Sequence, residues 1–167
     1  MPFVTEWGSA DRRNLVVFTP DVLRIFKKHQ QRFFWQTEGG GLLLGLRRGH
    51  HLEVVLATEP SHQDSRSTFS FVREVDGHAE VAKQAWLQGE KKIDYLGEWH
   101  THPQKVPTPS KLDRHEWEKI LLQQPKLTPM LFVVVGTQSM HVELHNGFQE
   151  KALSPLKRID SDREIAS

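Results

Sequence analysis

The sequence contains no cysteine among its 167 residues. This absence excludes disulfide bridges, a thiol nucleophile and zinc fingers built on cysteine. A zinc site in this protein must therefore be built from histidine, aspartate or glutamate, which are the other usual zinc ligands. The lack of cysteine also agrees with a cytoplasmic location, because disulfides are rare in that compartment.

Long apolar runs and an excess of charge of one sign are also missing. No apolar run approaches the ~20 residues of a membrane-spanning helix, and the opening stretch MPFVTEWGSADRR has no apolar signal core. The formal net charge of +1 gives no strong attraction to nucleic acid or to an anionic membrane. With 37% hydrophobic and 26% charged residues, we expect one soluble domain over residues 1–167, with no nucleic-acid or membrane partner.

The hydrophobic pattern mixes the period of strands with the period of helices. It predicts strands over residues 14–20, 41–60 (two strands joined near Gly49), 68–72, 93–100, 130–138 and 139–147. It predicts helices over residues 19–33, 76–92 and 109–124, the first with Thr19 as N-cap and Pro20 at its first position. Val81, Ala85 and Trp86 should face inward from the second helix. We therefore expect an α+β (mixed α/β) sheet flanked by helices, with a core over about 14–153 and a loosely held tail over 154–167.

The stretch GEWHTHPQKVPTPSKLD, residues 97–113, concentrates the polar chemistry of the chain. On a strand, residues two apart point to the same face, so His100 and His102 can aim two imidazoles at one point. If a helix begins near Pro109, Ser110 and Asp113 occupy its first turn. A strand end with two histidines and a helix start with one aspartate make three converging ligands. Three protein ligands and one open position are typical of a catalytic zinc site.

Each part of this pattern also has a structural explanation. A serine followed by an aspartate three residues later at a helix start is close to a capping box, which is compatible with metal binding. Histidines in a proline-rich loop are often ordinary surface residues. Glu38, before three glycines in TEGGGLLLGL, is a candidate base for a zinc-bound water, although a glutamate at a strand edge is often merely exposed. Because glycine permits close backbone approach, another segment could pack tightly beside Glu38.

Taken together, Glu38, His100-Thr101-His102, Ser110 and Asp113 resemble the JAMM signature of the JAB/MPN metalloprotease family. EGGGLLLG resembles the family's glutamate strand, and YLGEWHTHP resembles its metal strand. The resemblance extends over roughly residues 15–153. It implies a cytidine-deaminase-like fold, in which a curved, mostly antiparallel sheet lies between helices.

The resemblance also implies roles for these residues. His100, His102 and Asp113 would bind one Zn²⁺ per chain, Glu38 would hold and deprotonate the water, and Ser110 would stabilise the oxyanion. The implied reaction is hydrolysis of a peptide or isopeptide bond after the C-terminus of a ubiquitin-like or similarly conjugated protein. Such a zinc hydrolase would resemble a deubiquitinase in its chemistry.

Within the family, the compact length and the stretch YLGEWHTHPQKVPTPSKLD are most similar to bacterial JAB proteins encoded beside E1-like and E2-like proteins, especially in CBASS antiphage operons. This similarity implies a substrate in which a cGAS-like nucleotidyltransferase (CD-NTase) is joined through its extended C-terminal tail to a target. The segment Ser61–Asp76 is the main candidate for substrate contact. Two alternatives remain open: a peptidase that trims a ubiquitin-like or sulfur-carrier protein, and a non-catalytic JAB scaffold.

The remaining residues of the motif region have more ordinary interpretations. Trp99 alternates with the histidines and should pack in the core, whereas Glu98 either supports the site or forms a structural salt bridge. His115 points elsewhere on its helix and is not expected to be a ligand. His141 and His145 share one face of a strand, where we expect ordinary surface or partly buried roles.

Overall fold

The computed structural model describes residues 5–60, 65–66, 71–72, 75–89, 92–125, 128–145, 153–155 and 157–158. Its helices are α1 (Pro20–Lys28), α2 (Val75–Gln88) and α3 (Lys111–Gln123). Its strands are β1 (Glu6–Gly8), β2 (Leu15–Phe18), β3 (Gly40–Arg48), β4 (His51–Ala57), β5 (Ser65–Arg66), β6 (Phe71–Val72), β7 (Asp94–Thr101), β8 (Met130–Val135), β9 (Met140–His145), β10 (Leu153–Pro155) and β11 (Lys157–Arg158).

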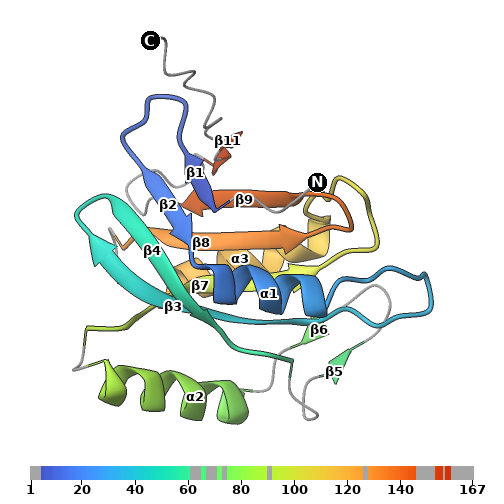
Figure 1. The fold of residues 1–167 in the computed structure, drawn as a ribbon, viewed down its shortest axis with the longest axis horizontal. Helices are drawn as coiled ribbons and strands as arrows, with labels where there is room; N and C mark the ends of the chain where they lie inside the picture. The colour runs from blue at the N-terminus through green and yellow to red at the C-terminus, as the bar shows by residue number, and fades with distance from the viewer. Residues whose placement is uncertain are drawn as a thin grey trace, which may run out of the picture.

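One large sheet organises the molecule, with the strand order β10-β9-β8-β7-β3-β4-β2-β1-β11. The β2–β4 and β7–β8 pairs are parallel, and the other pairs in this sheet are antiparallel. Helices lie against the sheet on different sides, as Figure 1 shows. The expectation of an α+β fold with a curved, mostly antiparallel sheet is therefore confirmed.

The pairing of β10 and β11 shows how strongly the large sheet curves. Only one residue separates β10 from β11, yet β10 pairs with β9 at one end of the strand order and β11 pairs with β1 at the other. The two edges of the sheet must therefore lie close together. Residues 154–167 were expected to be loosely held. Part of this segment pairs with the sheet, and residues 159–167 lie outside the described residues, so for them the expectation stays a prediction.

Helix α1 begins as its sequence predicts, with Pro20 at the first turn and the acidic Asp21 beside it. Thr19 is the N-cap residue, but its side chain makes no capping hydrogen bond and instead donates to the carbonyl of Val55. The buried residues of α1, among them Val22 and Phe26, pack into the main hydrophobic cluster. This packing fixes the start of the connection that leads to β3.

The inward face predicted for α2 is right for Ala85, which is partly buried, and wrong for Val81 and Trp86. Val81 and Trp86 are 43% and 39% exposed. The partly buried positions of the described part of α2 are Ala82 and Ala85, three residues apart on one helical face, and Gly89 just after the helix is also partly buried. A Cβ added to Gly89 would lie 2.4 Å from the Ile93 side chain, so glycine is needed where the chain leaves the helix. The partly buried face of α2 therefore carries alanines, and the larger Val81 and Trp86 lie outside it.

Glycines allow the strands around the metal motif to pack closely. A Cβ at Gly41 would lie 2.3 Å from the carbonyl oxygen of Thr58, so the predicted tight approach beside Glu38 is confirmed. Gly97 has a φ of +153°, and a Cβ there would lie 1.7 Å from the Leu131 carbonyl oxygen. Both positions therefore require glycine to bring β3, β7 and their neighbours together.

Within the described ranges, none of the helices combines the length and the apolar character required to cross a membrane. The strand predicted over residues 68–72 is described only at β6, which pairs with β5. The rest of the segment Ser61–Asp76 falls largely outside the described residues.

Candidate metal centre

His100 and His102 lie at the carboxyl end of β7, in the middle of the large sheet. His100 is opposite Gly40 of β3 and Val134 of β8, and the backbone N–H of His102 donates to Val135 at 2.9 Å. Both histidines are buried, and their Nε2 atoms are 3.2 Å apart. The alternation of a strand therefore points both rings to one place, as the spacing predicts.

Asp113 reaches the histidines from the first turn of α3. The backbone N–H of Asp113 donates to the Ser110 hydroxyl at 3.1 Å, and the backbone N–H of Ser110 donates to Asp113 Oδ2 at 2.6 Å. This reciprocal pair is a capping box, which fixes the direction of the helix start and of the Asp113 side chain. The predicted capping box is therefore present, and it orients the candidate ligand.

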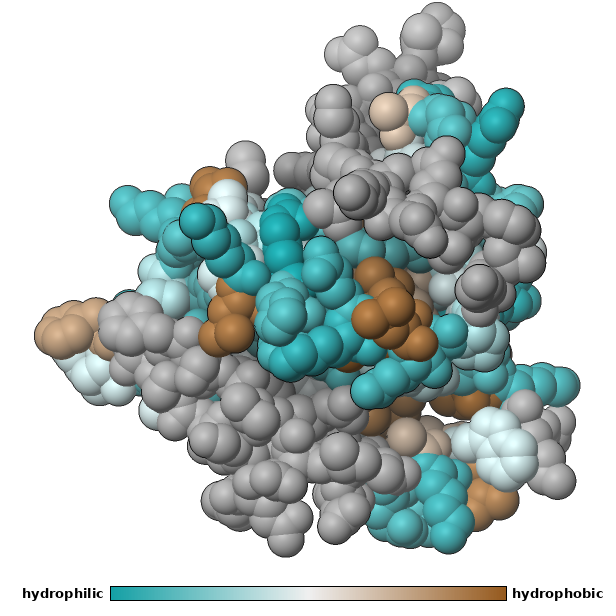
Figure 2. Space-filling view, turned by 180° about the vertical axis from the view of Figure 1, so that it is seen from behind, coloured by the Kyte–Doolittle hydropathy of each residue, from teal (hydrophilic) through white to brown (hydrophobic). Residues whose placement is uncertain are grey.

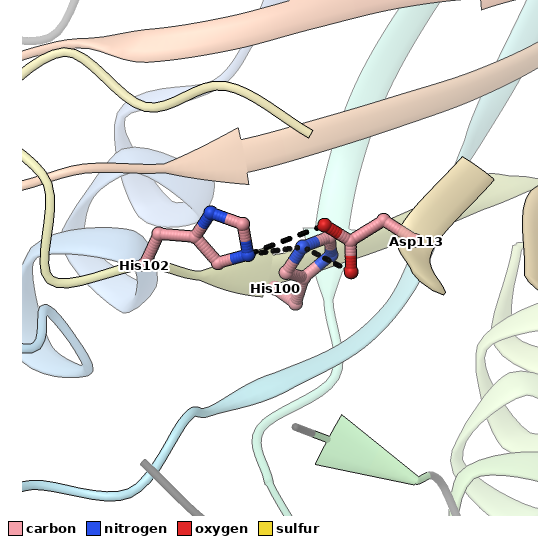
Figure 3. A group of neighbouring side chains, drawn as sticks. All are labelled: His100, His102 and Asp113. Carbon is pink, nitrogen blue, oxygen red and sulfur yellow. Dashed lines mark hydrogen bonds and ion pairs between the residues drawn. The ribbon is translucent and has the colours of Figure 1, made fainter. Parts of the chain in front are cut away.

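The three candidate ligands converge, as Figure 3 shows. His100 Nε2 lies 3.2 Å from Asp113 Oδ1, and His102 Nε2 lies 3.3 Å from Asp113 Oδ2. Nitrogen and oxygen ligands about 2.0–2.1 Å from a tetrahedral zinc ion are about 3.3 Å from one another. The observed spacing and the His-His-Asp donor set therefore fit a zinc ion with one position left open.

The charges of these groups are coupled. Burial would raise the pKa of Asp113, but hydrogen bonds from His100 and His102 hold that pKa far below its ordinary value. Burial would likewise lower the pKa of His102, but the hydrogen bond and charge of Asp113 raise it. Asp113 is therefore ionised throughout the neutral range. An ionised carboxylate beside two imidazoles is what a divalent cation requires.

Glu38 lies beside this cluster at the start of β3. Its side chain is buried, with Oε1 3.7 Å from His102 Nε2. Burial raises the pKa of Glu38 to about 7, with the His102 charge opposing and the Asp113 charge adding to this effect. A carboxyl group with such a pKa can both accept and release a proton near neutral pH. The structure thus brings Glu38 next to the three candidate ligands. Its role as the base stays a prediction.

Ser110 is at the rim of the cluster and is exposed. Its hydroxyl oxygen accepts the hydrogen bond from Asp113, which leaves its own O–H as a donor. The predicted role of Ser110 in stabilising an oxyanion needs such a donor, and that role stays a prediction.

A buried hydrogen-bond network behind Glu38 was missed by the sequence analysis. The Thr101 hydroxyl accepts from the backbone N–H of Gly39 at 2.9 Å and donates to Gln31 Oε1 at 3.2 Å. The backbone N–H of Thr101 also donates to the Gly39 carbonyl at 2.8 Å. The residue after Glu38 is thereby bonded to the residue between the two histidines. The only sequence signal was the position of Thr101 inside the histidine motif.

A second buried charge cluster also escaped the sequence analysis. Glu143 is 2% exposed and lies 2.9 Å from His141 Nε2, 3.2 Å from His145 Nε2 and 3.1 Å from Arg114 Nη2. Burial would raise the pKa of Glu143, but the contacts with these three residues lower it to about 2. The sequence HVELH shows that its two histidines and its glutamate share one face of a strand. It does not indicate that Arg114 of α3 lies against them.

The expectations for Trp99 and His115 are confirmed, and the two alternatives for Glu98 stay open. Trp99 is buried and its indole N–H donates to the Thr58 carbonyl at 3.1 Å, while Glu98 accepts a hydrogen bond from the Tyr95 hydroxyl. His115 is exposed and outside the cluster. The inner face of α3 is formed by a buried tryptophan and two partly buried aliphatic residues, Trp117, Ile120 and Leu121.

Comparison with known proteins finds relatives that match most of the chain. A CD-NTase/cGAS isopeptidase of Pseudomonas aeruginosa is 37% identical over 158 residues, which cover 94% of this chain and all of the relative. A protein of the same name from Escherichia coli is 33% identical over 79% of this chain and 83% of its own length. Another from Vibrio cholerae is 32% identical, over 88% of this chain and 90% of the relative.

The fold has a solved counterpart as well. A protein of Desulfitobacterium hafniense, solved in solution, superposes with a TM-score of 0.58 at 20% identity, over 84% of this chain and 88% of that chain. The family described as prokaryotic homologs of the JAB domain matches residues 19–146, a range that contains Glu38, His100, His102, Ser110 and Asp113. The resemblance seen in the motif is therefore confirmed over most of the chain, and the protein belongs to the prokaryotic JAB family.

Proposed function

We propose that this protein is a zinc-dependent isopeptidase that cleaves conjugates after the C-terminus of a protein partner, and that this partner is a CD-NTase of bacterial antiphage defence. The observation that carries the proposal is the convergence of His100, His102 and Asp113 beside the buried Glu38. The substrate class rests on relatives named as CD-NTase/cGAS isopeptidases, which match nearly all of this chain. We place the reaction in the cytoplasm.

In this proposal, His100, His102 and Asp113 hold the zinc ion. The ion, when bound, supplies a Lewis acid that polarises the scissile carbonyl and lowers the pKa of water. Glu38 lies on the side of His102 and accepts a proton from the attacking water. It then delivers this proton to the leaving amine, whether that amine belongs to a peptide backbone or to a lysine side chain.

Ser110 completes the reaction centre in this proposal. Attack on the carbonyl produces a tetrahedral oxyanion, which a preorganised donor stabilises. The hydroxyl of Ser110 is held in place because its oxygen accepts the hydrogen bond from the Asp113 backbone. Its O–H is free to turn toward the oxyanion, and losing one such donor costs about 10²–10³ in rate in other hydrolases.

The substrate must present an extended bond to a recessed centre. His100, His102 and Glu38 are buried at the end of β7 and before the start of β3, with Asp113 of α3 partly buried beside them, so a mobile C-terminal tail fits better than a folded loop. E1-like and E2-like proteins would form the conjugates that this enzyme removes. We also propose that the tail contacts the segment Ser61–Asp76 directly. Most of this segment falls outside the described residues.

Three fusions test the proposal. The purified zinc-loaded protein is offered a reporter placed after a cognate CD-NTase tail, after a scrambled tail and after ubiquitin. We expect cleavage directly after the last tail residue and a preference for the cognate tail. Cleavage of ubiquitin alone would move the protein to the ubiquitin-directed members of the family. No cleavage of any fusion by the zinc-loaded protein would contradict the isopeptidase assignment.

A further inference from the structure

Three consecutive aromatic side chains project from the connection between α1 and β3. Phe33, Phe34 and Trp35 are 52%, 78% and 64% exposed. Single exposed apolar residues are ordinary, and the face seen from behind in Figure 2 is mostly hydrophilic with hydrophobic residues in separate small areas. Three adjacent aromatic rings are different, because an exposed apolar patch of this kind marks an interaction site. We call these three residues the aromatic patch.

The rings of the aromatic patch are arranged as a unit. Phe33 and Trp35 stack with ring centroids 4.7 Å apart, and Phe34 meets Trp35 edge-on at 4.9 Å. The backbone beneath them is closed by Gln36, whose side-chain oxygen accepts from the N–H of Phe33 at 2.9 Å and whose own N–H donates to the Phe33 carbonyl. A partner therefore meets rings that are already ordered, which lowers the entropic cost of binding.

The aromatic patch is tied to the metal strand by buried hydrogen bonds. Gln31, which is almost completely buried, donates to the Gln36 carbonyl at 2.9 Å and accepts from the Thr101 hydroxyl at 3.2 Å. Thr101 separates His100 from His102, and Trp35 precedes Glu38 by three residues. The patch is thus carried by the connection that enters β3 at the end of the sheet where β7 places His100, as the ribbon in Figure 1 shows for that connection.

Another exposed apolar residue lies on the connection between β7 and α3. Val106, between His102 and Ser110, is 71% exposed. Both connections are anchored to the turn between β8 and β9. Gln30 donates to the carbonyls of Gly136 and Thr137, and Thr137 donates its backbone N–H to the Gln104 carbonyl. Apolar side chains on two separately anchored connections therefore lie around the same end of the sheet as the candidate ligands.

We propose that the aromatic patch is the docking surface for apolar side chains of the protein whose C-terminus forms the scissile bond. This inference rests on the proposed function, because it assigns the patch to the constant partner of the conjugate. The three relatives share the name CD-NTase/cGAS isopeptidase, which names the CD-NTase and no acceptor, so in this proposal the CD-NTase is the part of the conjugate that a preformed surface can match. Large aromatic side chains are the usual anchors of protein interfaces, and they bury much area at a small entropic cost.

The test compares Phe34→Ala and Trp35→Ala with the unaltered protein on the cognate CD-NTase fusion. We expect KM to rise about tenfold or more in each variant, because anchors of this kind carry most of the binding energy. We expect kcat to stay within about twofold, since the patch contributes binding that is equal in ground and transition states. The matched control is Leu122→Ala, at an 87% exposed leucine on the last turn of α3, which should leave both constants unchanged.

A binding measurement separates this inference from the proposed function. The dissociation constant for the CD-NTase is measured by calorimetry in a Glu38→Gln background, with and without Trp35→Ala, and Trp35→Phe should restore most of the affinity. If the unaltered protein cleaves the cognate fusion and the patch variants keep its KM, the docking proposal is overturned and the proposed function stands. If no fusion is cleaved, the proposed function fails, and an unchanged dissociation constant in Trp35→Ala would overturn the docking proposal independently.

Discussion

Two carboxylates share the neighbourhood of His102 and have opposite pKa shifts. Asp113 contacts both histidines at 3.2 and 3.3 Å, and its pKa is lowered well below the ordinary value. Glu38 lies further away, at 3.7 Å from His102, and burial raises its pKa to about 7. Environments that separate the pKa values of neighbouring carboxylates indicate different chemical roles. Asp113 is suited to hold a cation, and Glu38 is suited to move a proton.

Replacing Glu38 by glutamine should abolish proton transfer while leaving the zinc ligands intact. We expect cleavage of the cognate fusion to fall by about 10²–10⁴-fold, with zinc retained at about one ion per chain by elemental analysis. His102→Ala should instead lose zinc and activity together, and His115→Ala, at an exposed histidine on α3, should lose neither. Loss of zinc in the Glu38 variant would make Glu38 a ligand, and near-full activity would mean that another base is at work.

At the scale of elements, local patterns in the sequence predicted the candidate ligands better than the contacts between distant elements that hold them in place. The period of a strand placed His100 and His102 on one face, and the helix-start pattern placed Asp113 in a first turn. Contacts between distant elements have no local pattern: Thr101 bonds to Gln31, 70 residues away, and Arg114 contacts Glu143, 29 residues away. Such pairs depend on how strands and helices stack, which hydrophobic periodicity alone does not specify. The rotation of α2 was missed for the same reason.

The Thr101 hydroxyl connects the start of β3 to β7, so its loss should displace Glu38 without removing a zinc ligand. Thr101→Val removes the hydroxyl that accepts from the Gly39 N–H and donates to Gln31 Oε1, at a cost of about 1–3 kcal/mol in the free energy of unfolding. We expect kcat to fall while zinc content stays at about one ion per chain. Thr101→Ser keeps the hydroxyl and should retain most of the activity. Equal kcat in the valine and serine variants would show that this network does not position Glu38.

The contact between Glu143 and Arg114 joins β9 to the first turn of α3, beside Asp113, and it predicts a pH-dependent stability. The pKa of Glu143 is about 2 in the folded protein, compared with an ordinary value of 4.5. A lowered folded-state pKa contributes stability that is complete above pH 4.5 and is lost as the pH falls toward 2. We expect Glu143→Gln to lower the free energy of unfolding by about 3 kcal/mol at pH 7.

The measurement is urea unfolding of the unaltered protein and Glu143→Gln from pH 7 down to pH 3, with chelator present in both series so that zinc release does not contribute. The difference between the two proteins should be constant from pH 7 to about 5 and should then shrink. Glu116→Gln is a matched control, because Glu116 forms an exposed ion pair with Lys119 on the same helix. A difference that does not change with pH would contradict the assignment of the effect to the Glu143 charge.

At the scale of the whole molecule, the sheet and its core are held by apolar packing and strand pairing, neither of which needs a metal ion. The main hydrophobic cluster joins α1 to the central strands, and a second cluster places Trp117 of α3 against Met130, Phe132 and Val134 of β8. The candidate ligand His100 meets the second cluster, with its ring centroid 6.2 Å from that of Trp117. The pairing of β10 and β11 with opposite ends of the sheet adds a further restraint that needs no ion.

Removing the metal should therefore abolish activity without unfolding the protein. When the ion is removed, His100 and His102 can each pair with Asp113, whose oxygens lie 3.2 and 3.3 Å from their Nε2 atoms. We expect chelation to leave the far-ultraviolet circular dichroism unchanged. The melting temperature should fall, because a ligand that binds only the folded state stabilises it by RT ln(1 + [L]/Kd). One equivalent of zinc should restore both cleavage and melting temperature. Loss of the dichroism signal on chelation would instead make the ion a structural element on which the sheet depends.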